Sequence, residues 1–198
     1  MFILIMVDNQ LVDLAREGDP KAFCDLYDQS KDSLYRFAFY KLGSHEDAED
    51  AVQDCVMDAW RQIGNLRSSE AFSTWIFRIL TGCCNRRIKT LIKDRDKVEA
   101  VVQMQITDAA VETSAKPGVK YADRGDDQDE IASLTDNIDL SEALGQLSDQ
   151  EREVVLLSVV AGFTSAEVGD MTGLTAGGVR SKLSRSLSKM REFMEESA

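Results

Sequence analysis

Basic side chains gather near the C-terminus, on a stretch that predicts two short helices joined by a tight turn. Thr164 and Glu167 fit a capping box, Gly173 suits the turn, and Thr175 suits a second N-cap. In the second helix apolar residues recur at helical spacing, and no acidic residue lies among them up to position 191. A basic outer face on such a second helix fits the DNA major groove; the alternative is an amphipathic helix whose basic face is only solvated.

The overall composition restricts how the chain could use this face. The chain has 198 residues, of which 43% are hydrophobic and 29% charged, as in globular proteins of one large or two small domains. Its formal net charge is −12, so nucleic acid would not bind to the surface as a whole. Contact with DNA must therefore come from local basic patches.

The cysteine and histidine residues form no pattern that holds a metal. The four cysteines show no metal-ligand spacing and His45 is the single histidine, so we expect neither a metal site nor a cofactor. The thiols are expected to stay reduced in a cytoplasm and to serve as small buried residues. A redox role for the adjacent pair is the alternative. The cysteines are Cys24, Cys55, Cys83 and Cys84.

The first ninety or so residues predict three or four helices. A short helix ends near Gly18, and Asp19-Pro20 opens a second helix that ends at Gly43. Ser44 caps the next helix, whose buried face is expected to comprise Ala48, Val52, Cys55, Val56, Ala59, Trp60 and Ile63. Its opposite face is acidic, which either solvation or a basic partner would explain.

Composition then divides the chain. Residues 64–69 break the helical pattern, an aromatic helix follows, and Gly82 inside it should cost about 1 kcal/mol relative to alanine. Apolar residues thin out within residues 98–137, which contain an acidic run and are typical of a linker. We therefore expect an all-α fold of two small helical domains, residues 8–97 and 138–198, joined by a flexible acidic linker.

The N-terminal residues 1–7 are apolar but too short to span a membrane, and they lack the features of a signal peptide. We expect no stable membrane insertion. The amphipathic pattern begins just after Met6, which suggests Met6 in place of Met1 as the natural start.

Three stretches resemble the sigma factors of bacterial RNA polymerase, in the extracytoplasmic-function (ECF) class that keeps two domains and a linker. They are residues 47–54 (DAEDAVQD), residues 72–79 (FSTWIFRI) and residues 147–185, which begin with LS and end with GVRSKLSR. Because several motifs occur in the family's order, the match is more specific than one helix pair.

The resemblance implies that the N-terminal domain melts and reads the minus-ten promoter element as single-stranded DNA. A loop could enclose an extruded base, and the basic helix after it could hold phosphates. Trp75 could stack on a base, although its spacing favours core packing. The family commonly has Asn where Gly82 stands, so the minus-ten preference could differ. The minus-ten residues implied are Gly64, Asn65, Leu66, Arg67, Ser68, Arg86, Arg87 and Lys89.

The resemblance also implies contacts with core RNA polymerase and with the minus-thirty-five element. The acidic helix would bind the clamp of the largest subunit through Asp47, Asp50, Gln53 and Asp54, and the C-terminal domain would lie at the flap of the second-largest subunit. The linker would be either a mimic of the RNA backbone or a solvated spacer. The minus-thirty-five residues implied are Arg180, Ser181, Lys182, Ser184, Arg185 and Lys189.

Two other classes of function remain to be compared. A conventional helix-turn-helix regulator would also bind DNA through residues 161–191, but it would not bind core polymerase. An enzyme has little support, because the sequence contains no nucleophile–base pair and no phosphate-binding glycine loop. The resemblance further implies a cytoplasmic protein that is held inactive by an anti-sigma factor.

Overall fold

The structure is a computed structural model that describes residues 7–105 and 140–197, with side chains described outside 97–105 and 197. Every regular element in these residues is helical, so the all-α prediction is confirmed. The acidic run of the expected linker and the two candidate start positions lie outside the described residues.

The first three helices begin and end at the residues that the sequence indicates. They are α1 (Asn9–Arg16), α2 (Pro20–Leu42) and α3 (His45–Gln62). The Asp19 carboxylate accepts hydrogen bonds from the first backbone N–H groups of α2, and Gly43 ends this helix at a φ of 75°, where glycine has no Cβ to clash. The Ser44 hydroxyl caps α3 in the same way.

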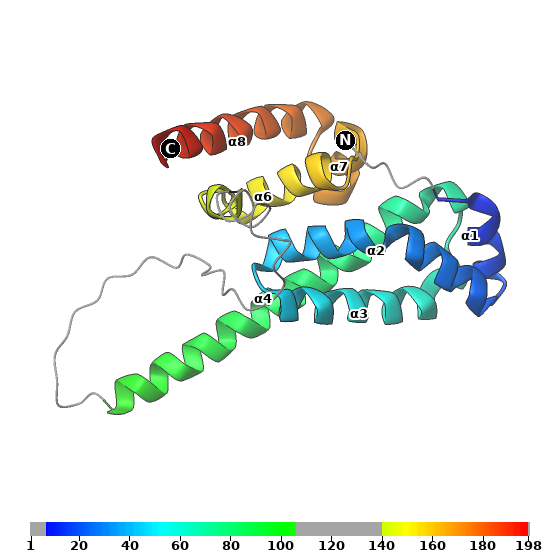
Figure 1. Ribbon diagram of the computed structural model, residues 1–198, viewed down its shortest axis with the longest axis horizontal. Coiled ribbons are helices and arrows are strands. Elements are labelled where there is room, and N and C mark those ends of the chain that lie inside the picture. Colours follow the sequence, from blue (N-terminus) through cyan, green and yellow to red (C-terminus); the bar gives the residue numbers. More distant parts are fainter. Residues whose placement is uncertain (1–6, 106–139, 198) are drawn as a thin grey trace, which may run out of the picture.

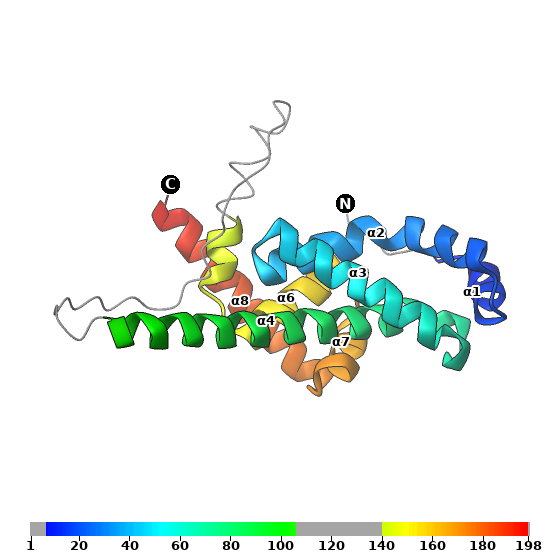
Figure 2. The same ribbon diagram turned by 90° about the horizontal axis from the view of Figure 1, so that it is seen from below.

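A long helix, α4 (Phe72–Gln105), follows two single 3₁₀ turns, η1 (Ile63–Asn65) and η2 (Ser69–Ala71). It packs against α2 and α3 and then runs beyond them, as the green helix in Figures 1 and 2 shows. The helix continues to Gln105, so the first eight residues of the expected linker, 98–105, are helical.

The C-terminal part of the chain is also helical. Residues 140–145 are followed by α6 (Asp149–Val155), which the Ser148–Glu151 capping box begins, and by a π-helical turn, η3 (Leu156–Val160). Helices α7 (Ser165–Thr172) and α8 (Ala176–Ser197) complete the fold. The sequence pattern did not predict the π-helical turn, because apolar residues fill this segment without a period.

The two halves of the chain pack against each other through α2 and α4 on one side and η3 and α7 on the other. Phe77 of α4 is fully buried between Phe37 of α2 and Phe163, with edge-on ring contacts at 5.5 and 5.1 Å. In Figure 1 the C-terminal helices accordingly lie alongside α2 and α4. One hydrophobic core therefore extends through both halves.

Some expectations of burial are wrong or only partly met. Cys24 is exposed, because it lies on the outer side of α2, whereas the other three cysteines are buried as expected. Trp60 is 39% exposed because it packs with one face on Phe23 at the edge of the bundle. Leu66 of the predicted DNA-binding loop is buried, although a base contact needs an exposed side chain. Leu187, one of the apolar residues at helical spacing in α8, is 39% exposed.

Candidate nucleic-acid and polymerase-binding surfaces

The helix pair α7 and α8 is held at a fixed angle by a close backbone contact. The Thr164–Glu167 capping box begins α7, and Gly173 ends it at a φ of 74°. A Cβ on Gly169 would lie 2.6 Å from the Leu174 carbonyl oxygen, closer than real Cβ atoms approach. Gly169 therefore lets the turn pack directly on α7, which sets the direction in which α8 leaves it.

Helix α8 has a buried side and a basic exposed side. Val179, Ser186 and Met190 are buried against the rest of the chain. Of the predicted minus-thirty-five residues, Lys182 is half-buried and the other five are exposed on the outer side: Arg180, Ser181, Ser184, Arg185 and Lys189. The guanidinium groups of Arg180 and Arg185 donate hydrogen bonds to backbone carbonyls of their own helix, at 3.3 and 3.2 Å. The result is an exposed basic surface on the outer side of α8.

One acidic group lies close to this basic surface. Glu151 accepts hydrogen bonds from the Ser148 hydroxyl and backbone N–H, at 2.7 and 2.9 Å. These bonds, with Lys189 and Lys182 nearby, hold the pKa of Glu151 below its ordinary value. The two lysines therefore lie beside the start of α6 as well as on α8.

The predicted minus-ten loop is an ordered turn tied to the first helix. The Ser69 hydroxyl donates a 2.5 Å hydrogen bond to Asp13 of α1, and this bond together with Arg16 lowers the pKa of Asp13. Gly64, Asn65, Arg67 and Ser68 are exposed, whereas Leu66 points into the core and is only 6% exposed. Leu66 thus anchors the turn, and the placement of its side chain does not fit a direct base contact.

Two of the predicted DNA-binding arginines are paired with acids of α3, and for Arg87 these acids are predicted polymerase-binding residues. Arg87 lies 2.5 Å from Asp47 and 3.2 Å from Asp50, and Arg86 lies 2.9 Å from Asp58. The hydrogen bonds to Asp47 and Asp58 raise the pKa of Arg87 and Arg86 respectively. Lys89 is exposed on the next turn of α4. The structure therefore brings together two sets of residues that the sequence treats as separate surfaces.

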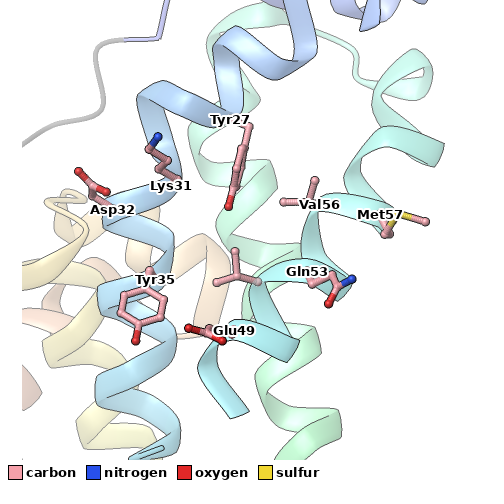
Figure 3. A pocket seen from close by; sticks show the side chains of 9 residues that line it. Tyr27, Lys31, Asp32, Tyr35, Glu49, Gln53, Val56 and Met57 are labelled. Atoms are coloured by element: carbon pink, nitrogen blue, oxygen red, sulfur yellow. The ribbon is translucent and has the colours of Figure 1, made fainter. Parts of the chain in front are cut away.

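The acidic side of α3 keeps three of its four predicted residues exposed. Asp50, Gln53 and Asp54 are exposed, and the Asp47 side chain is 14% exposed beneath Arg87. Gln53 also lines a groove of about 450 Å³ between α2 and α3. Figure 3 shows Tyr27, Tyr35 and Met57 around this groove.

These groove residues were missed by the sequence analysis. Each belongs to a helical stripe that periodicity assigns to the core or to solvent, so only the packing of α2 on α3 brings them together. Met57 is 50% exposed, which adds an apolar element to the otherwise acidic surface.

The structure also bears on the expectations for Trp75, for Gly82, for metal sites and for membrane-spanning helices. Trp75 is half-buried and packs on Phe72 with ring centroids 5.9 Å apart, so core packing accounts for it. A Cβ on Gly82 would meet nothing within 4 Å. Within residues 7–105 and 140–197, no group of three acidic, histidine or cysteine residues could hold a metal ion. No helix in the same ranges is long and apolar enough to cross a membrane.

Comparison with known proteins identifies both halves of the chain. The family model for Sigma-70 region 2 matches residues 26–94, and that for Sigma-70 region 4 matches residues 138–190. The chain is 24% identical to the ECF RNA polymerase sigma factor SigW of Bacillus subtilis, over 96% of this chain and 98% of SigW. It is 25% identical to SigM of Mycobacterium tuberculosis, over 94% of this chain and 84% of SigM.

Solved structures show the same fold. CnrH, in complex with the cytosolic domain of CnrY, aligns with a TM-score of 0.68 and 21% identity, over 96% of this chain and 99% of CnrH. The sigma factor RpoE of Bartonella quintana, in complex with the anti-sigma factor NepR, aligns with a TM-score of 0.64 and 24% identity, over 88% of this chain and 98% of RpoE. With the two sigma regions matched in order, the chain belongs to the ECF sigma factors of bacterial RNA polymerase.

Proposed function

We propose that this sigma factor binds core RNA polymerase and directs initiation at promoters that it reads at two elements. Residues 138–198 read the minus-thirty-five element as duplex, and residues 8–97 open and read the minus-ten element as a single strand. The observation that carries the proposal is the exposed face of α8, where five polar and basic side chains lie on one side of a helix whose other side is packed.

This face suits a major groove. The groove admits one α-helix, and arginine can bind guanine through two hydrogen bonds while lysine neutralises phosphates. Arg180 and Arg185 donate hydrogen bonds to backbone carbonyls of their own helix. Binding DNA would therefore break no ion pair that the structure gives for these two residues. We assign base reading to Arg185 and Arg180 and phosphate contacts to Lys182 and Lys189.

The N-terminal half supports the second contact. Gly64, Asn65 and Arg67 are exposed on a turn that Leu66 and Ser69 fix in place. A rigid turn with exposed polar groups can enclose an unstacked base without the entropy cost of ordering a flexible loop on binding. Lys89, exposed on α4, is available for the phosphates of the strand.

The acidic side of α3 is the surface that we assign to the polymerase clamp. Asp50, Gln53 and Asp54 are exposed on one rigid helix and suit an arginine-rich partner. The tyrosines and Met57 of the neighbouring groove would extend the contact with apolar area. In this scheme the polymerase carries the catalytic site, because sigma factors are initiation factors and are not enzymes.

We further propose that an anti-sigma factor controls this chain. The support is that two proteins of the same fold were solved as complexes, CnrH with CnrY and RpoE with the anti-sigma factor NepR. Such a partner would hold the sigma factor away from polymerase until a signal releases it.

Transcription in vitro tests the proposed function. Core polymerase alone and core polymerase with this chain are compared on a promoter library. If the chain acts as a sigma factor, we expect transcripts to be enriched from promoters that share two elements at a fixed spacing. If the chain is instead a conventional transcriptional regulator, the free chain should bind duplex DNA and should form no stable complex with core polymerase.

A further inference from the structure

Three cysteines meet where α3 packs on α4. Cys55 of α3 and Cys84 of α4 are fully buried, and Cys83 is 2% exposed. The Cys55 thiol donates a 3.7 Å hydrogen bond to the Ile76 carbonyl oxygen of α4, and the thiols of Cys55 and Cys83 are close enough to shift each other's pKa. Helix packing therefore brings together two thiols that are 28 positions apart in the sequence, in place of the adjacent pair that the sequence suggested.

The groups around the pair lower the pKa of one thiol and raise that of the other. An Nη atom of Arg86 lies 3.2 Å from Cys83 Sγ, and the same atom lies 2.9 Å from Asp58. The interaction with the Cys55 thiol and the nearby Arg86 lower the pKa of Cys83, while the same interaction and burial raise the pKa of Cys55. Burial raises the pKa of Cys84 to about 12.

Cys83 can be reached from the surface. It lines a pocket of about 340 Å³, together with residues from both helices that include Gln53, Asp54 and Thr90. The Arg86 side chain above the sulfur is 61% exposed and can swing into solvent. A small peroxide can therefore approach the sulfur of Cys83, whereas Cys55 lies behind it in the core.

We propose that Cys83 and Cys55 form a thiol pair that hydroperoxides oxidise to a disulfide. The Cys83 sulfur attacks one peroxide oxygen, the O–O bond breaks, and the other oxygen leaves as an alcohol or water after taking a proton. The Cys55 sulfur then attacks the Cys83 sulfenic acid, and its hydroxyl leaves as water with the Cys55 proton. In sum two thiols lose two electrons, which reduce one peroxide.

The position of the pair gives the oxidation a consequence. A disulfide would join α3 to α4 at the pocket that also contains Asp50, Gln53 and Asp54, and it would remove any negative charge from the sulfur that Arg86 contacts. Oxidation would therefore change the surface assigned to the polymerase clamp. This consequence rests on the proposed function, whereas the chemistry of the pair does not.

Mass spectrometry of the full-length chain tests the chemistry. The chain is treated with one equivalent of hydrogen peroxide, its free thiols are blocked with N-ethylmaleimide in denaturant, and it is digested. We expect the loss of two hydrogen atoms, a Cys55–Cys83 cross-link that dithiothreitol reverses, and alkylated Cys24 and Cys84. A cross-link through Cys84, or oxidation of exposed Cys24 before Cys83, would overturn the proposal.

Three variants sharpen the test. Cys55→Ser should accumulate a sulfenic acid on Cys83 that dimedone traps, Cys83→Ser should abolish the cross-link, and Cys24→Ser should leave it unchanged. If a buried serine unfolds a variant, cross-link mapping in the wild-type chain still shows whether the Cys55–Cys83 disulfide forms. The measured quantity is the mass of the free chain, so this test of the thiol chemistry does not depend on any polymerase assay.

Discussion

Lys41 of α2 and Glu153 of α6 form an ion pair with 2.7 Å between Nζ and Oε2, although 112 positions separate them in the sequence. The side chains are 6% and 19% exposed, so water screens the pair little. In a second contact between the halves, a guanidinium nitrogen of Arg78 donates a 3.1 Å hydrogen bond to the Asp170 carbonyl. Polar contacts of defined geometry thus join the two halves across their shared core.

The proposed reading of two promoter elements calls for a more extended arrangement than this docked one. Ser69 and Arg180 each lie about ten residues from the Arg78–Asp170 contact, so they are at most about 65 Å apart. Elements named minus-ten and minus-thirty-five are centred about 25 base pairs apart, or about 85 Å at 3.4 Å per step. We therefore expect the halves to separate when the chain binds a promoter.

The first prediction concerns the ion pair that opposes this separation. Glu153→Gln should leave the buried Lys41 charge without a counter-charge and weaken docking by about 1–3 kcal/mol. Energy transfer between a dye on exposed Cys24 and one on a cysteine at exposed Ser188 measures the distance between the halves. The variant should shift the free chain to longer distances, and exchanging the two charges should shift it back. An unchanged distance distribution would contradict a latch role for the pair.

The second prediction concerns the side of α3 that we assign to the polymerase clamp. Asp54 is exposed, and the ion pairs of the described residues do not include it, whereas Asp50 is paired with Arg87 at 3.2 Å. Asp54→Lys should therefore weaken binding to core polymerase by about tenfold or more and leave the fold intact. Binding is measured by biolayer interferometry with immobilised core enzyme. The control Glu17→Lys reverses an exposed charge at the end of α1, and equal losses in both variants would reject the assigned surface.

The third prediction separates phosphate contacts from base contacts on α8. Lys189→Ala should weaken binding to matched and scrambled promoters alike and reduce the salt slope by up to about 0.9. Arg185→Ala should instead relax the preference at particular bases. Both are measured with holoenzyme on labelled duplexes over a salt series. Equal losses for Arg185→Ala on matched and scrambled duplexes would rule out its role in base reading.

The fourth prediction concerns the pH dependence of the Ser148–Glu151 capping box. Because the folded pKa of Glu151 lies below its ordinary value, the box contributes stability above the ordinary range of glutamate. This contribution is lost as the pH falls through the folded pKa. Urea unfolding from about pH 7 to about pH 3 should show a smaller loss of stability for Glu151→Gln than for the wild type. An identical pH profile for both chains would exclude this contribution.

Features set by neighbouring residues could be predicted from the sequence, and features set by helix packing could not. The caps at Asp19, Ser44, Ser148 and Thr164 depend on residues two or three positions away, so their patterns identify them directly. In contrast, the Cys55–Cys83 contact depends on how α3 packs on α4, and periodicity contains no information on that register.

The errors about burial have the same origin. Helical spacing shows that Trp60 and Cys24 lie near an apolar stripe, but it does not show where the neighbouring helix ends. The pairing of Arg87 with Asp47 was missed because the family resemblance assigns the two residues to different partners. A family motif identifies which residues matter, whereas the tertiary structure decides which of them interact in the free chain.

The fifth prediction concerns the close contact that orients α8. Gly169→Ala would place a Cβ 2.6 Å from the Leu174 carbonyl oxygen, and this backbone atom cannot move without shifting the turn. We expect a loss of about 1–3 kcal/mol in the free energy of unfolding, together with weaker binding to the minus-thirty-five element. Gly177→Ala is the matched control, because a Cβ there meets nothing within 4 Å and alanine should stabilise α8 by up to about 1 kcal/mol. Urea unfolding gives the first quantity and duplex binding by holoenzyme the second. If Gly169→Ala were as stable as Gly177→Ala, the close approach of the turn to α7 would not determine the position of α8.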